Sequence, residues 1–127
     1  MLPGGRLAAQ CGGQGNIQQV LQSAASVSGE EPFSAYFEGF VYPAYFASPG
    51  DTQERLAYAG FSEVDCWLTD RPVVPEQPEL FLRSIILQPF TSRLPRALAD
   101  GFVARVIERL PAPLTIDYVR LNINARA

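Results

Sequence analysis

The amino-acid sequence predicts an α/β fold, and two patterns support this prediction. Segments in which apolar and polar residues alternate, as in strands, are separated by segments with apolar residues three and four positions apart, as in helices. The last strand-like segment, Leu114–Ala125, carries apolar residues on both faces, which is typical of a strand in the middle of a sheet. No internal repeat and no linker interrupts the 127 residues, so we expect a single domain over residues 1–127.

Two shorter strands are expected before the last one. Arg6–Cys11 is a run of small and apolar residues, and Ser62–Thr69 alternates Val, Cys and Leu with Glu, Asp and Trp. Glycines end the first of these strands. Asn16 then precedes a helical pattern, and we expect its side chain to cap that helix.

The remaining segments predict further helices. Ser48 and Pro49 are suited to begin a helix that ends at Gly60, because Ser caps, Pro fits the first turn and Gly adopts the left-handed conformation after the last turn. Phe33–Phe46 is rich in aromatic residues and predicts a short helix followed by an irregular connection. Two more helices are expected at Leu80–Ile86 and Leu94–Leu110.

The composition excludes several kinds of chemistry. The chain has no His, which removes the commonest general base, the usual zinc ligand and every Ser-His or Cys-His pair. Cys11 and Cys66 have no metal-ligand spacing, so we expect two buried thiols in a reducing compartment and no metal. The net charge of −3 argues against nucleic acid, and no apolar run reaches membrane-spanning length. We therefore expect a cytoplasmic protein with no nucleic-acid or membrane partner.

Four motifs, taken in order, resemble a known family. They are Leu2-Pro3-Gly4-Gly5-Arg6-Leu7, the stretch Ala9–Asn16, the stretch from Pro49-Gly50-Asp51-Thr52 to Ala59-Gly60-Phe61, and Asp117–Ile123. Together they resemble the second half of class I S-adenosylmethionine-dependent methyltransferases, in particular bacterial members often labelled trans-aconitate methyltransferases. The resemblance spans nearly all 127 residues but only the C-terminal half of the family.

The resemblance implies a partial Rossmann-like fold. In that family the final strand inserts antiparallel between the fifth and sixth strands. Leu114–Ala125 would then lie between Arg6–Cys11 and Ser62–Thr69 in a three-stranded mixed sheet, with helices packed on it. This arrangement agrees with the two-sided apolar pattern of the last segment.

The resemblance also implies that the cofactor-binding half is missing. The family holds S-adenosylmethionine with a glycine-rich loop after its first strand and an acidic residue at the end of its second, and neither strand is expected here. Gly13-Gln14-Gly15 lacks the third glycine of a dinucleotide fingerprint, since Gln18 stands there; a strand-to-helix turn is the other interpretation. We expect the 127-residue chain by itself to bind the cofactor weakly or not at all and to be catalytically inactive.

Candidate substrate-binding residues follow the first strand. Ligands of open α/β sheets bind beyond the carboxyl ends of the strands. Gln10, Cys11 and Asn16 lie at that end of Arg6–Cys11, and are therefore expected to contact a small organic substrate.

Four aromatic residues and one Arg complete the candidate site. By the resemblance, Tyr36, Tyr42, Tyr45 and Phe46 cover the substrate pocket, where a Tyr offers an apolar wall and a polar tip. The alternative is that these rings pack in a core or a subunit interface. Arg83 could bind a substrate carboxylate; the alternative is a solvated helix face.

Without a preceding strand, Arg6–Cys11 would have an open edge with no charge at Leu7–Ala9 to discourage pairing. We therefore expect a homodimer, formed either by edge-to-edge strands or by the aromatic segment; the alternative partner is a missing N-terminal half. The two leading hypotheses are a truncated methyltransferase and a free-standing dimeric binding module, carried by a mobile gene, without catalytic activity. A fragment with no ligand is the third.

Overall fold

The computed structural model describes residues 3–127, which fall into two compact units. Unit 1 comprises residues 3–16, Tyr45–Pro72 and Asp117–Ala127, and unit 2 comprises Ile17–Ala44 and Val73–Ile116. The predicted turn at the start of the chain is present at Pro3 and Gly4, while Leu2 lies outside the described residues. Among the helices of the described chain, none is both long and apolar enough to span a membrane.

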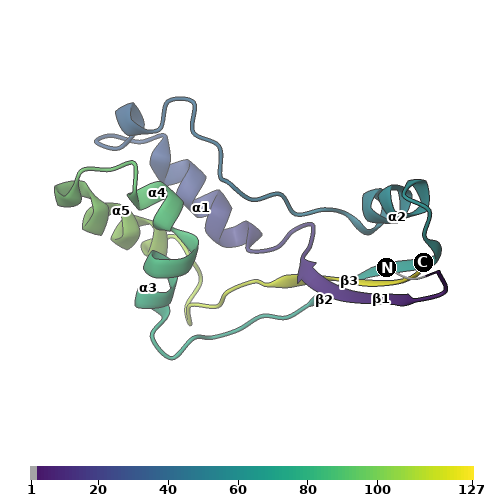
Figure 1. Ribbon diagram of the computed structural model, residues 1–127. Helices are drawn as coiled ribbons and strands as arrows, with labels where there is room; N and C mark the ends of the chain where they lie inside the picture. The colour runs from purple at the N-terminus through teal and green to yellow at the C-terminus, as the bar shows by residue number, and fades with distance from the viewer. Residues whose placement is uncertain (1–2) are drawn as a thin grey trace. The chain divides into compact units, whose positions relative to one another are not determined.

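Unit 1 contains a three-stranded antiparallel sheet (Figure 1). Its strands are β1 (Arg6–Gly12), β2 (Ser62–Asp70) and β3 (Val119–Arg126), in the order β1-β3-β2. The predicted central position of the last strand is therefore confirmed. The prediction of a mixed sheet is wrong, because the two strands that run in the same direction, β1 and β2, are not neighbours.

The last strand is shorter than the sequence pattern predicts. Residues before Val119 lie outside β3, and Ile116 instead forms an isolated bridge with Val73 in unit 2. The Ile116 N–H donates to the Val73 C=O at 2.7 Å, and the Ile116 side chain is fully buried. Ile116 and the apolar residues of β3 thus belong to different units. The apolar pattern is continuous in the sequence, but it covers two separate structural segments.

Within β3 only one set of alternate positions is apolar. Leu121 and Ala125 are buried, and Ile123 between them pairs with the buried Cys66 of β2. The other positions of β3 are polar: Arg120, Asn122, Asn124 and Arg126. The expectation of two apolar faces is therefore wrong for β3 itself.

The helix α2 (Pro49–Tyr58) begins and ends as its sequence predicts, and it packs against β2 (Figure 1). The Ser48 Oγ accepts a hydrogen bond from the Asp51 N–H at 3.1 Å. At the other end Gly60 has φ +100°, and the Phe61 N–H donates to the Leu56 C=O at 3.0 Å. Both ends are thus fixed by local hydrogen bonds.

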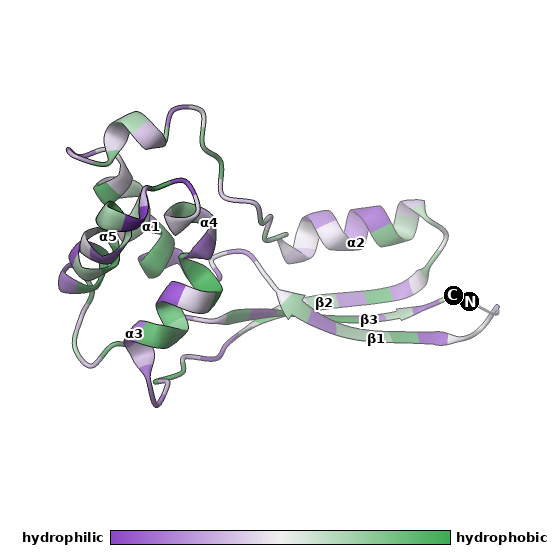
Figure 2. Ribbon diagram, turned by 60° about the vertical axis from the view of Figure 1, so that its left-hand side comes forward, coloured by the Kyte–Doolittle hydropathy of each residue, from purple (hydrophilic) through white to green (hydrophobic). Residues whose placement is uncertain are grey.

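Unit 2 is helical. Its elements are α1 (Gln18–Ser28), the 3-10 turn η1 (Ser34–Tyr36), α3 (Pro78–Phe81), the π-helical turn η2 (Leu82–Ile86), α4 (Gln88–Thr91) and α5 (Arg96–Glu108). The two longest helices, α1 and α5, pack together, and the Ser23 Oγ of α1 donates to the Val106 C=O of α5 at 2.9 Å. Hydrophobic segments, green in Figure 2, are visible on these helices. The expected helices at Leu80–Ile86 and Leu94–Leu110 are confirmed with shifted ends.

Candidate functional site

The turn that follows β1 is held to the first residue of β3 by two hydrogen bonds. The Gly13 N–H donates to the Val119 C=O at 3.0 Å, and the Asn16 Oδ1 accepts from the Val119 N–H at 2.7 Å. The Gln14 N–H donates to the Ala47 C=O at 2.9 Å. The turn therefore joins three segments of unit 1 that are far apart in the sequence.

Asn16 does not cap α1, contrary to the sequence prediction. The N-cap position is occupied by Ile17, with φ 49°, and no side chain caps the helix. Asn16 is only 6% exposed, and its side-chain Oδ1 accepts a hydrogen bond from the Val119 N–H instead. Asn16 thus satisfies the backbone N–H of Val119 at the start of β3, not an N–H at the start of α1.

Two glycines allow this turn to pack closely. A Cβ at Gly12 would lie 2.9 Å from the Asn16 Nδ2 and 3.0 Å from the ring of Phe46. A Cβ at Gly13 would lie 2.6 Å from the Leu68 side chain. Gly15, in the same turn, has φ 84°, a conformation that glycine adopts readily. Asn16 and Phe46, both candidate site residues, are thus neighbours around Gly12.

Gln10 and Cys11 lie side by side on β1 but, as successive strand residues, on opposite faces. The Gln10 Nε2 donates to the Asn122 Oδ1 at 2.8 Å, and the Asn122 Nδ2 donates to the Thr69 Oγ1 at 2.9 Å, so one hydrogen-bond chain crosses all three strands. Cys11 is exposed, whereas Cys66 is 7% exposed. The prediction of two buried thiols is therefore wrong for Cys11, because the edge strand β1 is uncovered there. Burial raises the pKa of the Cys66 thiol.

Tyr45 also belongs to unit 1. Its side chain is exposed, and the Arg55 guanidinium of α2 lies over its ring at 5.6 Å from the centroid. Of the candidate residues, unit 1 therefore holds Gln10, Cys11, Asn16, Tyr45 and Phe46. The other three belong to unit 2.

Tyr42 is part of an aromatic cluster in unit 2. Its hydroxyl donates to the Ile86 C=O at 2.9 Å, and its ring stacks on Phe90 with centroids 5.5 Å apart. Burial raises the pKa of the Tyr42 hydroxyl. The cluster continues through Phe33, Phe37, Phe40 and Phe102. These contacts give Tyr42 a packing role in the core of unit 2.

Tyr36 and Arg83 lie elsewhere in unit 2. Tyr36 is exposed at the end of η1, and its backbone C=O accepts a 3.4 Å hydrogen bond from Arg93. Arg83 forms an ion pair with the carboxylate of Asp100 in α5. The guanidinium proposed to bind a substrate carboxylate therefore already contacts an acidic side chain of the protein.

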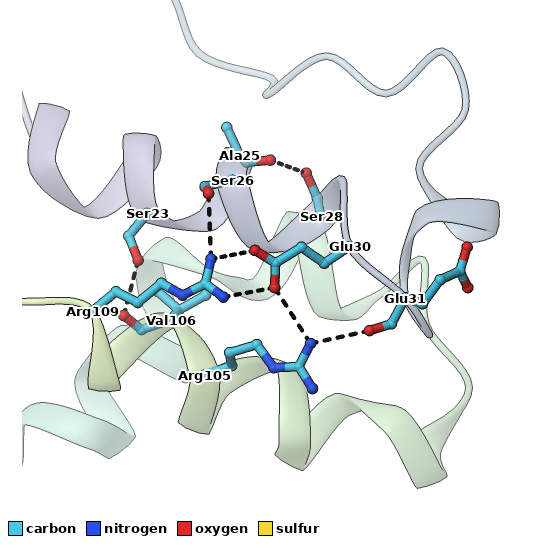
Figure 3. Close-up of polar contacts among 9 residues, drawn as sticks. All are labelled: Ser23, Ala25, Ser26, Ser28, Glu30, Glu31, Arg105, Val106 and Arg109. Atoms are coloured by element: carbon cyan, nitrogen blue, oxygen red, sulfur yellow. Dashed lines mark hydrogen bonds and ion pairs between the residues drawn. The ribbon is translucent and has the colours of Figure 1, made fainter.

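Sequence reasoning did not find a polar cluster between α1 and α5 (Figure 3). Both Arg109 Nη atoms donate to the Glu30 carboxylate at 2.6 Å, and Arg105 donates to the same carboxylate at 3.4 Å. The hydrogen bond from Arg109, with the positive charges of Arg109 and Arg105, lowers the pKa of Glu30. Arg109 directly follows α5, and its four-residue spacing from Arg105 places both side chains on the same side of this helix end; that spacing is the signal the sequence offered.

A surface hollow of about 410 Å³ adjoins this cluster. It is lined by Gln19, Gln22, Ser23, Ser26, Arg109, Leu110 and Pro111. Within the range 3–127, no group of three or more His, Cys, Asp or Glu side chains is placed to hold a metal ion. Comparison of the chain with protein-family models and with curated proteins finds no match.

Proposed function

We propose that this chain is the substrate-side half of a class I S-adenosylmethionine-dependent methyltransferase with a Rossmann-like sheet, acting in the cytoplasm. The observation that carries the proposal is the strand order β1-β3-β2, in which β3 runs antiparallel between two strands of common direction. That arrangement is the one implied by the sequence resemblance for the last three strands of the family. It is a demanding match, because β3 is last in the sequence yet central in the sheet.

The glycine-rich turn of this chain does not fit a cofactor loop. Such loops bind anionic groups with free backbone N–H groups. Here the N–H of Gly13 and the N–H of Gln14 are already hydrogen-bonded to Val119 and Ala47. A methyltransferase would therefore need the cofactor-binding half from residues other than these 127, and the chain by itself would not transfer a methyl group.

The carboxyl end of β1 is the proposed substrate side. Asn16 and Phe46 lie beside Gly12 at this end, and Gln10 and Cys11 precede Gly12 on opposite faces of β1, so amide, thiol and aromatic groups are all present in this part of unit 1. Such a mixture suits a small organic molecule with polar substituents. Methyl transfer needs mainly positioning and exclusion of water, which these groups could supply beside a cofactor held by the other half.

The outer edge of β1 is the proposed junction with the other half. The Gly13 N–H and the Gly5 C=O both bond toward β3. Because alternate strand residues face the same side, the N–H groups of Ala8 and Gln10 face away from β3. We propose that a further strand pairs with β1 at this edge.

Fragment complementation tests this proposal. The chain is co-expressed with the cofactor-binding half of a trans-aconitate methyltransferase, and transfer of a labelled methyl group to a panel of small carboxylates is measured. Transfer is expected only with both halves present. Ala8→Pro should abolish it, since Pro removes the outward N–H but leaves the β1–β3 hydrogen bonds intact, whereas Ala8→Val should not. Equal transfer with Ala8→Pro, or no transfer by any pairing of soluble halves, would overturn the proposal.

The open edge also favours a second candidate function. In a free-standing binding module without catalytic activity, β1 would pair with β1 of a second copy. The uncharged run Leu7–Ala9 at this edge favours such pairing. Light scattering distinguishes the two candidates, because only the module should lose its dimer on Ala8→Pro.

A further inference from the structure

The outward face of α2 carries four exposed side chains in a stripe. Asp51, Glu54, Arg55 and Tyr58 stand at relative positions 0, 3, 4 and 7, which share one face of a helix. They line a hollow of about 500 Å³, and Tyr58 is 97% exposed. No residue of α2 is fully buried, so packing on the sheet does not account for this stripe.

Two residues of the stripe, Arg55 and Tyr58, are of the types that protein interfaces favour. Tyr and Arg are enriched among the residues that contribute most to binding, since they combine large contact areas with directional polar groups. Arg55 is held over the ring of Tyr45, which is itself 68% exposed, so the guanidinium is partly ordered before any partner binds. Ordering a side chain in advance lowers the entropic cost of association.

The charge pattern of the stripe is complementary to itself. If two α2 helices lie antiparallel about a two-fold axis between Glu54 and Arg55, then Glu54 of each copy faces Arg55 of the other. The same axis places Asp51 of one copy opposite the Tyr58 hydroxyl of the other, because Asp51 and Tyr58 are equally far from the axis in opposite directions along the helix. A parallel arrangement would instead oppose like charges. The antiparallel arrangement also brings opposite ends of the two helix dipoles together.

We propose that α2 forms a two-fold symmetric interface with α2 of a second copy of this chain, through two Glu54–Arg55 ion pairs and two Tyr58–Asp51 hydrogen bonds. Such an interface is isologous, since the same patch serves both copies. It does not involve β1 and so does not depend on the proposed function. A ten-residue helix is only about 15 Å long, and the interface is therefore small. We expect a weak dimer, with a dissociation constant of roughly 10–100 µM.

Charge reversal tests this interface by sedimentation velocity. Arg55→Glu would face Glu54, and Glu54→Arg would face Arg55, so each variant alone should dimerise at least about 10-fold more weakly. In an equal mixture, Glu at 55 of one chain meets Arg at 54 of the other, and the native pair forms on the second side. The mixture should therefore regain the wild-type affinity within about 3-fold.

Two controls complete the experiment. Arg71→Glu makes the same charge change at an exposed position of unit 1 outside the stripe and should leave dimerisation unchanged. Ala8→Pro should also leave it unchanged, which separates this interface from pairing at β1. A wild-type chain that stays monomeric at about 1 mM, single variants that dimerise like wild type, or a mixture that remains monomeric would each overturn the proposal.

Discussion

The side chain of Asn16 bonds the backbone of Val119, with the Asn16 Oδ1 2.7 Å from the Val119 nitrogen. This contact links the turn after β1 to the first residue of β3. The Val119 C=O is bound by the Gly13 N–H of the same turn, so both polar backbone groups of Val119 are satisfied by one short segment. The contact fixes the end of β1 at which the substrate is proposed to bind.

Replacing Asn16 by Ala should destabilise the protein. The substitution leaves the partly buried Val119 N–H without its acceptor, which costs about 1 kcal/mol of unfolding free energy. Urea denaturation measures this loss. Gln14→Ala serves as the control, because the Gln14 side chain is exposed and only its backbone is bonded to Ala47. Equal stabilities of the two variants would contradict the assigned role of Asn16.

Gly13→Ala and Gly50→Ala should change stability in opposite directions. The added methyl group at Gly13 would lie 2.6 Å from Leu68 and 2.9 Å from the Leu121 Cβ, and such overpacking costs about 1–3 kcal/mol. At Gly50, in α2, nothing lies within 4 Å of the new Cβ. There the higher helix propensity of Ala should stabilise the protein by about 0.5–1 kcal/mol. Thermal unfolding of the two variants checks the sign of each change.

The features that the sequence predicted correctly are those with local causes. Ser48 caps α2 through a hydrogen bond to Asp51, only three residues away. Gly60 ends the same helix, where the Phe61 N–H bonds the Leu56 C=O five residues before it. The central position of β3 was also predicted, from the family resemblance and the apolar pattern together. The pattern failed at Ile116, because burial in unit 2 and burial in the sheet give the same alternation of residue types.

The candidate site was predictable only in part, because its contacts join distant positions. Asn16 has the residue type of an N-cap, and nothing near it in the sequence indicates Val119 as its partner. Likewise the carboxylate that pairs with Arg83 belongs to Asp100 of another helix. Cys11 is exposed on the outer strand β1 of the sheet, and residue type alone does not reveal this.

The two cysteines should differ strongly in reactivity. Cys11 is exposed, whereas Cys66 is buried in β2 and its pKa is raised, so less of its thiolate is present at neutral pH. Timed alkylation followed by mass spectrometry should show rapid modification at Cys11 and slow modification at Cys66. In Cys11→Ser only the slow phase should remain. Rapid labelling of that variant would show that β2 opens readily or that Cys66 is not buried.

Tyr42→Phe should reduce the stability of unit 2. The substitution keeps the ring on Phe90 but removes the hydroxyl that donates to the Ile86 C=O, at an expected cost of about 0.5–1.5 kcal/mol. Tyr36→Phe makes the same change at an exposed residue and should cost little. If Tyr42→Phe is as stable as Tyr36→Phe, the Tyr42 hydroxyl is not needed for packing.

The Glu30 cluster should make stability depend on pH in the acidic range. Arg109 and Arg105 lower the pKa of Glu30 from its usual value of 4.5. A carboxyl group whose pKa is lower in the folded state stabilises the protein above its unfolded-state pKa, and this contribution is lost as the pH falls through the folded-state pKa. Unfolding midpoints followed from neutral pH to below 4.5 should therefore decline less steeply for Glu30→Gln than for wild type.

Two comparisons isolate the ion pairs as the cause of this pH dependence. Glu38→Gln removes an exposed carboxylate outside the cluster and should leave the acid slope closer to that of wild type. The cluster is partly exposed, so high salt should reduce the difference between Glu30→Gln and wild type. Nuclear magnetic resonance titration of Glu30 in Arg109→Ala should show its pKa moving up toward 4.5, because the bidentate partner is gone. An unchanged pKa in that variant would assign the shift to a group other than Arg109.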